Sequence, residues 1–330
     1  MGNSERVLVT GGHGFVGSHL VDLLLRQDVS VRCLLRPGRS MDVFEGKPVE
    51  VVRGDLRGRE GLADAVRGVT RVYHIAGLIA ARGPGHFDSV NRDGTRRLAE
   101  AVAVAAPECR RFVYVSSQAA AGPSRDGVPL DESAPPHPVT HYGRSKLGGE
   151  QVLAPSLGTV PWTIVRPPAV YGPRDRGVLP FFQLAARGLA ADLDGPGRRF
   201  NMIHANDLAE GIRVAGAARA SVGRIYFLTD AKPCSYRDVG AALAAAFGRK
   251  LWRLPVPDVV VDLAAVAADE LAALTGKPQI FGRQKAIELK SRYWLCSPAR
   301  AQADFGWSVR LGLEEGMAET ARWYREAGWL

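Results

Sequence analysis

A tyrosine and a lysine four residues apart could carry proton-transfer chemistry in this chain. Tyr142 and Lys146 stand at i and i+4 in the run YGRSK, a spacing that puts both side chains on one face of a helix. A phenol with a pKa of about 10 exchanges protons poorly at neutral pH, and a neighbouring ammonium together with a cationic nicotinamide ring would lower that pKa. The run YVSS ends in hydroxyls, of which Ser117 could hold a substrate oxygen. These residues predict general acid–base catalysis by Tyr142.

A glycine-rich turn near the N-terminus predicts a dinucleotide site. The run TGGHGFVG at 10–17 follows a short apolar segment and precedes a helical pattern. Its glycines fit both G-x-G-x-x-G and G-x-x-G-x-x-G. Glycine is needed there for the tight turn, for close approach of a diphosphate to the backbone, and for packing of the helix against the strand. The free N–H groups at the start of that helix would bind the diphosphate.

Two arginines at the end of the second predicted strand bear on the choice of dinucleotide. An acidic residue at this place would bind the ribose hydroxyls of NAD, whereas arginine accommodates a 2′-phosphate. Arg36 occupies the position and Arg39 follows, with no acidic residue between them. The sequence therefore favours NADP(H), with NAD(H) as the alternative. Asp55, which follows the third predicted strand, would lie near the adenine amino group.

Alternating strand and helix patterns in the first half of the chain must position these groups. Strands are predicted at 6–10, 30–35, 49–53, 71–75, 111–116 and 162–166, with helices at 15–27, about 88–106 and about 141–153. This alternation predicts an α/β fold, a parallel sheet with helices on both faces. After residue 167, frequent proline and glycine predict an irregular region that shapes a substrate site. The apolar stretch 256–274 contains four carboxylates, which excludes a membrane span and indicates an amphipathic helix.

Composition and charge narrow the class of protein. The 43 Lys and Arg residues exceed the 34 Asp and Glu residues, for a net charge of +9, but the arginines are scattered rather than gathered in a stripe. A nucleic-acid binder is therefore not predicted, whereas an anionic small molecule is. The four cysteines are far apart and fit neither a disulfide framework nor a metal site, which indicates a reducing cytoplasm. The N-terminal run MGNSERVLVT contains no apolar signal core.

Taken together, the motifs resemble the extended short-chain dehydrogenase/reductase family, within the NAD-dependent epimerase/dehydratase superfamily. This resemblance implies a Rossmann-type doubly wound parallel sheet of seven strands with a smaller C-terminal substrate domain. The Rossmann domain would span 1–166, and 167–330 would mainly bind substrate, with about 200–230 returning to the core. The motifs are TGGHGFVG at 10–17, GDL at 54–56, HIAG at 74–77, NRDGT at 91–95, YVSS at 114–117, YGRSK at 142–146, RPPAVYGP at 166–173 and IHANDLAEGI at 203–212.

The resemblance also implies roles for individual residues. Asn91 would be the family's helix-start asparagine, and His204 and Asp207 would tie the substrate domain to the core. The catalytic residues would be Ser117, Tyr142 and Lys146. The cofactor would contact Gly11, Gly14, Phe15, Val16, Gly17, Arg36, Arg39, Asp55, Leu56, His74, Ala76, Gly77, Tyr142, Lys146 and Pro167, and the substrate Ile79, Ala119, Ala120, Ala169, Val170 and Tyr171.

Departures from the family patterns select a branch. Dehydratases of the family carry an Asp-Glu pair after the hydroxyl residue, where this chain has Gln118-Ala119-Ala120, and epimerases usually place Asp where Arg36 stands. The chain is similar instead to 3β-hydroxysteroid dehydrogenases and dihydroflavonol reductases. This predicts hydride transfer between a nicotinamide and a ketone or secondary alcohol of an apolar steroid-, flavonoid- or ketoacyl-like molecule. A sugar-nucleotide epimerase and a non-catalytic NADP-binding sensor remain the alternatives. The resemblance also implies a homodimer formed by the helices at 88–106 and 141–153.

Overall fold

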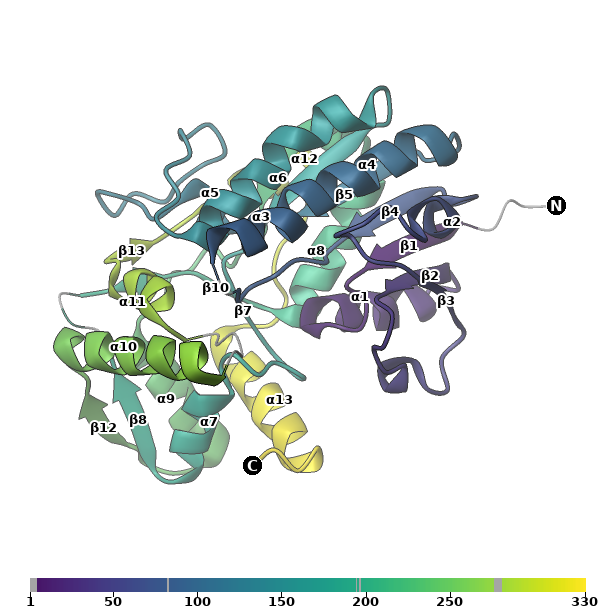
Figure 1. The fold of residues 1–330 in the computed structure, drawn as a ribbon. Coiled ribbons are helices and arrows are strands. Elements are labelled where there is room, and N and C mark those ends of the chain that lie inside the picture. Colours follow the sequence, from purple (N-terminus) through teal and green to yellow (C-terminus); the bar gives the residue numbers. More distant parts are fainter. Residues whose placement is uncertain (1–4, 82, 194, 196, 276–280) are drawn as a thin grey trace.

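A seven-stranded parallel sheet lies at the centre of the computed structural model, which describes residues 5–81, 83–193, 195, 197–275 and 281–330 (Figure 1). The predicted α/β fold of Rossmann type is confirmed. The strands pair in the order β11-β6-β5-β4-β1-β2-β3. Their bounds are β1 (Arg6–Thr10), β2 (Ser30–Leu35), β3 (Val49–Arg53), β4 (Arg71–His74), β5 (Arg111–Val115), β6 (Trp162–Arg166) and β11 (Arg224–Phe227).

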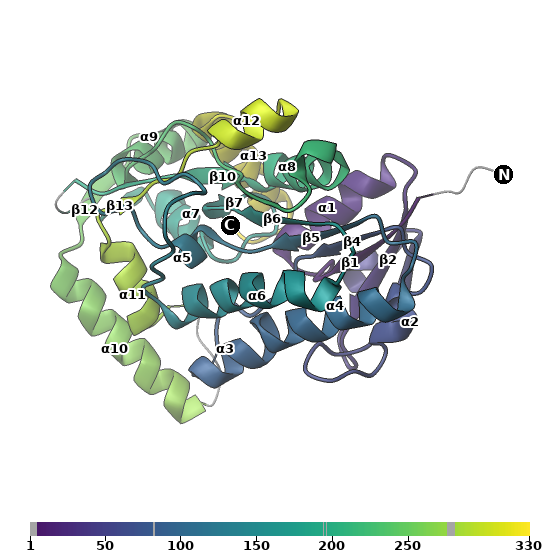
Figure 2. The same ribbon diagram turned by 90° about the horizontal axis from the view of Figure 1, so that it is seen from above.

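Helices cover both faces of this sheet because the strands are apolar on both sides (Figure 2). In β1, Val7 and Val9 belong to one buried core and Leu8 to the other. The first core is covered by α1 (Phe15–Leu25), α8 (Ala205–Ala217) and α12 (Ala299–Phe305). On the other side lie α2 (Leu62–Val66), α3 (Pro84–Asn91), α4 (Asp93–Ala105) and α6 (His141–Leu157).

The strand order reverses between β1 and β4, whose ends Thr10 and His74 are paired in register. In open α/β sheets, ligands bind outside the carboxyl ends of the strands at such a point. The glycine-rich turn follows β1 there, and the segment after β5 begins with Ser116 and Ser117 at the same edge. The topology therefore brings the predicted cofactor and proton-transfer residues to one edge of the sheet.

Several predicted element boundaries are wrong. The single helix expected at about 88–106 is two helices, α3 and α4, separated at Arg92. At this break the Asn91 side chain bonds both backbone groups of Leu78, a contact that no local pattern encodes. The helix expected to end near Leu153 continues through Pro155 to Leu157, and the helix expected to reach residue 27 ends at Leu25. Strands β4 and β5 each end one residue earlier than predicted.

The region after residue 167 contributes to both parts of the molecule. Helix α8 and strand β11 belong to the central layers, whereas most later elements gather in a separate mass around their own core (Figure 1). In the described part of the chain, no helix is long and apolar enough to cross a membrane.

The remaining elements are α5 (Gln118–Ala121), β7 (Ala169–Tyr171), α7 (Leu179–Ala186), β8 (Leu189–Asp192), β9 (Arg199–Phe200), β10 (Met202–His204), α9 (Tyr236–Phe247), β12 (Trp252–Pro255), α10 (Asp258–Thr275), α11 (Arg283–Lys290), β13 (Tyr293–Trp294) and α13 (Leu313–Glu326), with short 3₁₀ turns at Asp42–Phe44 and Arg219–Ser221.

Candidate active site

Ser117 and Tyr142 meet where the short helix α5 packs against the start of α6. Ser117 caps α5, and its hydroxyl accepts a hydrogen bond from the Ala119 amide at 3.1 Å. Thr140 caps α6 in the same manner, through the amide of Gly143 at 3.1 Å. A Cβ at Gly143 would collide with the carbonyl oxygen of Ala119, so glycine lets the two helices approach. The Ser117 hydroxyl is consequently within hydrogen-bonding reach of the Tyr142 phenol.

Lys146 lies one turn further along α6 in a buried position. Its Nζ donates to the carbonyl oxygen of Val115 at 2.6 Å and lies 4.6 Å from the centre of the Tyr114 ring. Burial lowers the pKa of Lys146 to about 7, and the nearby Glu150 carboxylate opposes that shift. The ammonium is therefore directed to the end of β5 and changes its charge near neutral pH.

The pKa of Tyr142 is shifted upward, whereas the sequence predicted a downward shift. Burial raises the pKa of Tyr142 to about 12, and the hydrogen bond from Ser117 opposes this rise only in part. In the protein alone, Lys146 is directed to the Val115 carbonyl and does not produce the expected lowering, so the desolvation of the phenolate outweighs the hydrogen bond from Ser117. Tyr142 is thus protonated at neutral pH, the state of a general acid.

A buried ion pair lies below these residues and joins three elements. Glu150, one turn after Lys146 in α6, accepts from Arg166 Nε at 2.9 Å and Nη2 at 2.5 Å. Its Oε1 also accepts from the Ser116 hydroxyl at 2.5 Å. The carboxylate thereby fixes the ends of β5 and β6 against α6. Sequence reasoning missed Glu150, although the spacing Tyr142, Lys146, Glu150 at i, i+4, i+8 could have indicated it.

Replacing Glu150 with Gln should lower the free energy of unfolding by about 3–5 kcal/mol, because it leaves the Arg166 guanidinium buried without a counter-charge. The two side chains are only 4% and 2% exposed. Denaturant unfolding followed by far-UV circular dichroism measures the change. The matched control is Glu100→Gln, whose pairs with Arg59 and Arg96 are partly exposed and should contribute less than about 1 kcal/mol. Equal effects of the two substitutions would contradict the assigned role.

The glycine-rich turn fits a diphosphate. Gly11 has φ +75°, and a Cβ there would lie 2.7 Å from the amide nitrogen of Ala76. A Cβ at Gly17 would collide with the Gly11 carbonyl oxygen, so both positions require glycine. Gly14 is the N-cap of α1 and supplies no side-chain hydrogen bond to its first turn. The amides at the start of this helix, including those of Phe15 and Val16, therefore suit an anionic group.

A cluster of basic groups lies beside this turn, at the end of β2. Burial and then the charges of Arg39 and Arg36 lower the pKa of His13, whose Nδ1 is buried without a hydrogen-bond partner. Burial and the charge of Arg39 likewise lower the pKa of Arg36. Asp55 is held by Arg57 through contacts of 2.6 and 3.0 Å, and this pairing lowers its pKa. The mutual repulsion of the arginines and histidine makes the cluster suited to an anion. His13, which sequence reasoning missed, lies within the motif itself.

The last residue of β4 is buried and braces the strand ends, whereas the backbone after β4 passes close to Lys146. His74 is fully buried, with its ring nitrogens 2.7 Å from Thr10 Oγ1 and 2.9 Å from Thr95 Oγ1. Burial lowers the pKa of His74 to about 3, so it stays neutral and braces the strand ends. A Cβ at Gly77 would lie 3.5 Å from Lys146 Nζ, which places this backbone beside the candidate site.

Other residues of the predicted cofactor set lie around this edge or in the core. The Ala76 amide donates to Thr10 Oγ1 at 3.2 Å, so Ala76 lies beside the end of β1. Leu56 is a core residue packed against Gly94. Pro167 follows β6, and its carbonyl accepts from the Gln118 amide at 2.8 Å, which places it against α5.

The residues predicted to line the substrate site are not all brought together. Ala119 and Ala120 are buried in the packing of α5, whereas Ile79 and Ala169 are exposed and Val170 is half-buried. Tyr171 instead belongs to the C-terminal core, where a Cβ at Gly316 would collide with its hydroxyl.

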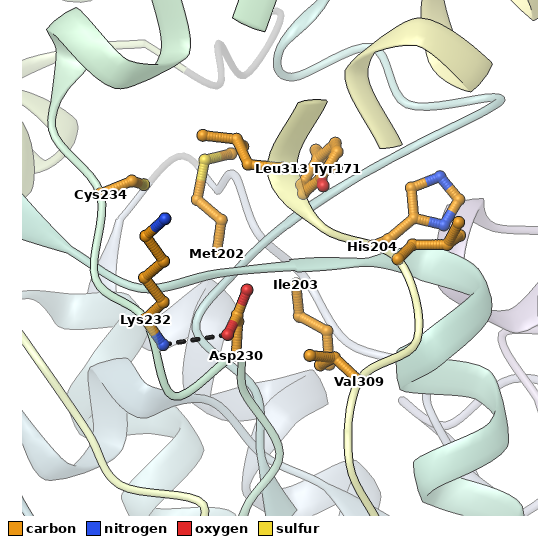
Figure 3. Close-up of a pocket in the computed structure, with 10 residues that line it drawn as sticks. Tyr171, Met202, Ile203, His204, Asp230, Lys232, Cys234, Val309 and Leu313 are labelled. Atoms are coloured by element: carbon orange, nitrogen blue, oxygen red, sulfur yellow. Dashed lines mark hydrogen bonds between the residues drawn. The ribbon is translucent and has the colours of Figure 1, made fainter. Parts of the chain in front are cut away.

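Tyr171 also lines a cavity of about 20 Å³, with room for about one water (Figure 3). His204 lies beside it, with the two ring centres 5.3 Å apart. Asp207, in the next turn, accepts from the amides of Arg310 and Leu311 at 3.1 and 3.0 Å and so ties the C-terminal segment to α8. This cavity is too small for an organic substrate.

Helix α11 from the C-terminal mass contacts the start of α6. Gln284 accepts from the His141 amide at 2.7 Å, and Glu288 accepts from the Thr140 hydroxyl at 3.3 Å. The Glu288 charge also reaches Tyr142, where it helps to raise the pKa of the phenol. Sequence reasoning missed both α11 residues, because more than 140 positions separate them from α6. Among the described residues, no group of three or more His, Cys, Asp or Glu side chains could hold a metal ion.

The doubly wound sheet, with a proton-transfer pair and a glycine-rich turn at one of its edges, defines a Rossmann-type oxidoreductase. The family model of the NAD dependent epimerase/dehydratase family matches residues 7–228. The chain belongs to that family. It is an enzyme of the extended short-chain dehydrogenase/reductase type, as its motifs predict.

Its relatives include reductases and dehydrogenases. The chain is 35% identical over 328 residues to a ceramide reductase of Caulobacter vibrioides, with 98% of this chain and 96% of the relative covered. It is 28% identical to a 3-beta-hydroxysteroid dehydrogenase of Mycolicibacterium neoaurum, with 97% and 92% covered. The fold is similar to that of a Thermus thermophilus UDP-glucose 4-epimerase in complex with NAD, with a TM-score of 0.76, 27% identity, and 98% and 99% covered. The predicted 3β-hydroxysteroid dehydrogenase-like branch is confirmed.

Proposed function

We propose that this chain is an NADP(H)-dependent ketone reductase or secondary alcohol dehydrogenase for an apolar, lipid-like molecule. The observation that carries the proposal is the meeting of Ser117 and Tyr142 at the carboxyl edge of the sheet, with Lys146 one turn further along α6. The glycine-rich turn lies at this edge too. A proton-transfer group and a diphosphate site at one sheet edge suit hydride transfer to or from a carbonyl carbon.

In the proposed reaction the bound nicotinamide supplies or accepts the hydride, and the protein handles the proton. Tyr142 donates its phenolic proton to the carbonyl oxygen as the ketone is reduced. The Ser117 hydroxyl donates a hydrogen bond to the same oxygen and orients it. Because the pKa of Tyr142 is raised to about 12, the residue holds its proton at neutral pH and suits the direction of reduction. In oxidation, the rate should rise with pH as the phenolate forms.

The basic cluster supports the choice of NADP(H). The charges of Arg39 and Arg36 lower the pKa of His13, so these three side chains lie close together, and a 2′-phosphate would add negative charge beside them. The diphosphate would lie against the amides that begin α1, and Lys146 would donate to the nicotinamide ribose. These residues would therefore hold the diphosphate, the nicotinamide ribose and the 2′-phosphate of NADP(H).

The surroundings of Tyr142 support an apolar substrate. Phe87 of α3 lies with its ring centre 6.2 Å from that of Tyr142. Ile79, which is exposed, lies a few residues after the end of β4. Helix α5, which follows Ser117, contains Ala119 and Ala120 in place of the carboxylates that an elimination would need. The ceramide reductase and the steroid dehydrogenase among the relatives are named for substrates of this apolar kind.

A panel of carbonyl compounds tests the proposal. Ketosphingolipid, ketosteroid, dihydroflavonol and 3-ketoacyl compounds are each offered with NADPH, and loss of absorbance at the nicotinamide band is followed. UDP-glucose and UDP-galactose serve as the comparison set for an epimerase. Turnover of an apolar ketone supports the proposal, whereas interconversion of the sugar nucleotides would replace it. Tight NADPH binding without turnover of any compound would favour a sensor.

Cofactor affinity should fall as the pH rises above 7, because the pKa of Lys146 is lowered to about 7. If only the ammonium form donates to the ribose, the apparent Kd for NADPH should rise roughly 50-fold between pH 7 and pH 9. Fluorescence titration of NADPH at a series of pH values measures this. Lys146→Arg, whose guanidinium keeps its charge, should show no such dependence. A Kd of the unaltered protein that is constant from pH 7 to 9 would contradict a cofactor contact made by a Lys146 ammonium with a pKa of about 7.

We also propose a homodimer formed through α4 and α6, as the resemblance implies. These helices pack side by side on one face of the sheet (Figure 2). Sedimentation at micromolar concentration that gave only a 35.5 kDa species would remove this proposal.

A further inference from the structure

Helix α11 contacts two different parts of the protein through two of its faces. Ala286 and Leu289 pack into one apolar core with Val261 of α10. Gln284 and Glu288 are one helical turn apart and lie on the other side of α11, where both contact the start of α6. Figure 2 shows α11 between α10 and the start of α6. Helix α11 therefore connects the C-terminal mass to the first turn of α6.

The amide of His141 obtains its hydrogen-bond partner from α11. His141 is the first residue of α6, and the first amides of an α-helix have no acceptor within the helix itself. The side-chain oxygen of Gln284 accepts from this amide at 2.7 Å, which is the distance of a well-formed hydrogen bond. The cap at the start of α6 is thus completed by a side chain 143 positions further along the chain.

Glu288 acts on the same turn through Thr140. The Thr140 hydroxyl donates to Glu288 at 3.3 Å and accepts from the Gly143 amide at 3.1 Å. Because the hydroxyl proton is directed to Glu288, the hydroxyl oxygen is left to accept from Gly143. Tyr142 lies between His141 and Gly143 in the chain. The two α11 side chains therefore hold the backbone on both sides of the residue that carries the phenol.

We propose that Gln284, assisted by Glu288, is a positioning residue of the reaction, which holds the first turn of α6 so that Tyr142 stays beside Ser117. The inference rests on the proposed function, in which Tyr142 donates the proton. Helix ends open more readily than helix interiors, and a displacement of about 1 Å at a reacting group can cost about 10² in rate. The C-terminal mass acts on proton transfer in this way through the backbone of α6.

Gln284→Met tests the proposal on the full chain loaded with NADPH. Methionine is close to glutamine in size but lacks the carbonyl oxygen that accepts from the His141 amide. The single-turnover rate of ketone reduction should fall about ten- to a hundredfold. The Kd for NADPH should not change, because Lys146 lies one turn further along α6. Gln284→Glu keeps an oxygen acceptor for the amide, and its rate should stay within about twofold of the unaltered rate.

A second pair of variants tests the contribution of Glu288. Glu288→Met should lower the rate less than Gln284→Met does, because the Glu288 contact is longer and reaches the helix through Thr140. Glu288→Gln keeps an acceptor for the Thr140 hydroxyl and should restore the rate. The matched control is Gln302→Met in α12, which covers the other face of the sheet. Gln302 is exposed, so this variant should react as the unaltered chain does.

Hydrogen exchange separates a positioning role from a purely structural one. In Gln284→Met, the amides at the start of α6 should exchange at least about fivefold faster, since a hydrogen bond of the cap is lost. A thermal melt verifies that the variant is folded. Faster exchange together with an unchanged single-turnover rate would leave Gln284 with a structural role only, and the proposal would be wrong.

Two further results would overturn the proposal. One is a Gln284→Met chain that matches the unaltered chain in both exchange and rate. The other is a Gln284→Glu chain that reacts as slowly as Gln284→Met. An unaltered chain that reduces none of the ketones would refute the proposed function and this inference with it. An unaltered chain that reduces a ketone, beside a Gln284→Met chain of equal rate, would refute this inference alone.

Discussion

Tyr142→Phe is expected to lower kcat for ketone reduction by about 10²–10⁴, the usual contribution of a positioned general acid. The substitution removes only the phenolic oxygen and its proton, while the ring that packs near Phe87 remains. Cofactor affinity should be unchanged if Lys146 supplies the ribose contact. Single-turnover kinetics under saturating NADPH, with an apolar ketone as substrate, measures the chemical step.

A second tyrosine serves as the control, to show that the loss of kcat is specific to the Tyr142 hydroxyl and does not follow from removing any buried tyrosine hydroxyl. Tyr226 donates to Asp304 at 2.6 Å on the other face of the sheet, away from Ser117. Tyr226→Phe should lower stability without lowering kcat. If Tyr142→Phe kept the unaltered single-turnover rate, Tyr142 would not be the proton donor, and the meeting of Ser117 and Tyr142 would have only a structural role.

Arg36→Asp should reverse the cofactor preference. One charged hydrogen bond from guanidinium to a 2′-phosphate contributes about 1.5–3 kcal/mol, which corresponds to roughly ten- to over a hundredfold discrimination. Arg36 lies beside Arg39 and His13, and an aspartate there would repel the phosphate and accept from the ribose hydroxyls of NADH. The ratio of kcat/KM for NADPH to that for NADH, before and after the substitution, measures the change. Higher salt should weaken NADPH binding more than NADH binding.

Arg110→Asp is the matched control for net charge. Arg110 is exposed directly before β5, at the opposite edge of the sheet from the basic cluster. It should leave the cofactor ratio unchanged. An unaltered enzyme that prefers NADH would refute the assignment of Arg36 to the adenosine ribose.

Local patterns in the sequence determined the sheet and the parts of the site that are contiguous in the chain. Strands β1, β2, β3 and β6 have the predicted bounds because each is a short segment rich in apolar residues whose ends are marked by a charged residue, glycine or proline nearby. The glycine-rich turn was recognisable because its function depends on backbone conformation within a few residues. The spacing of Tyr142 and Lys146 on one helix face is likewise a local property.

The electrostatic state of the site was decided by the tertiary structure. The sequence shows that an ammonium stands near a phenol, but not that Lys146 turns to the Val115 carbonyl. Burial then moves the two pKa values in directions that the spacing does not predict, down for Lys146 and up for Tyr142. Desolvation depends on every element packed around a group, and these come from distant parts of the chain.

Contacts between distant segments decided the rest. Glu150 meets Arg166 through the packing of α6 on β6, and Gln284 reaches His141 across more than 140 residues. Tyr171, expected near the substrate, is directed into the C-terminal core. The helix within 256–274 was predicted from its pattern, but which of its faces is buried depends on where α11 lies. A sequence fixes the period of its apolar residues, whereas only the packed neighbours determine which apolar face is covered and which is left exposed.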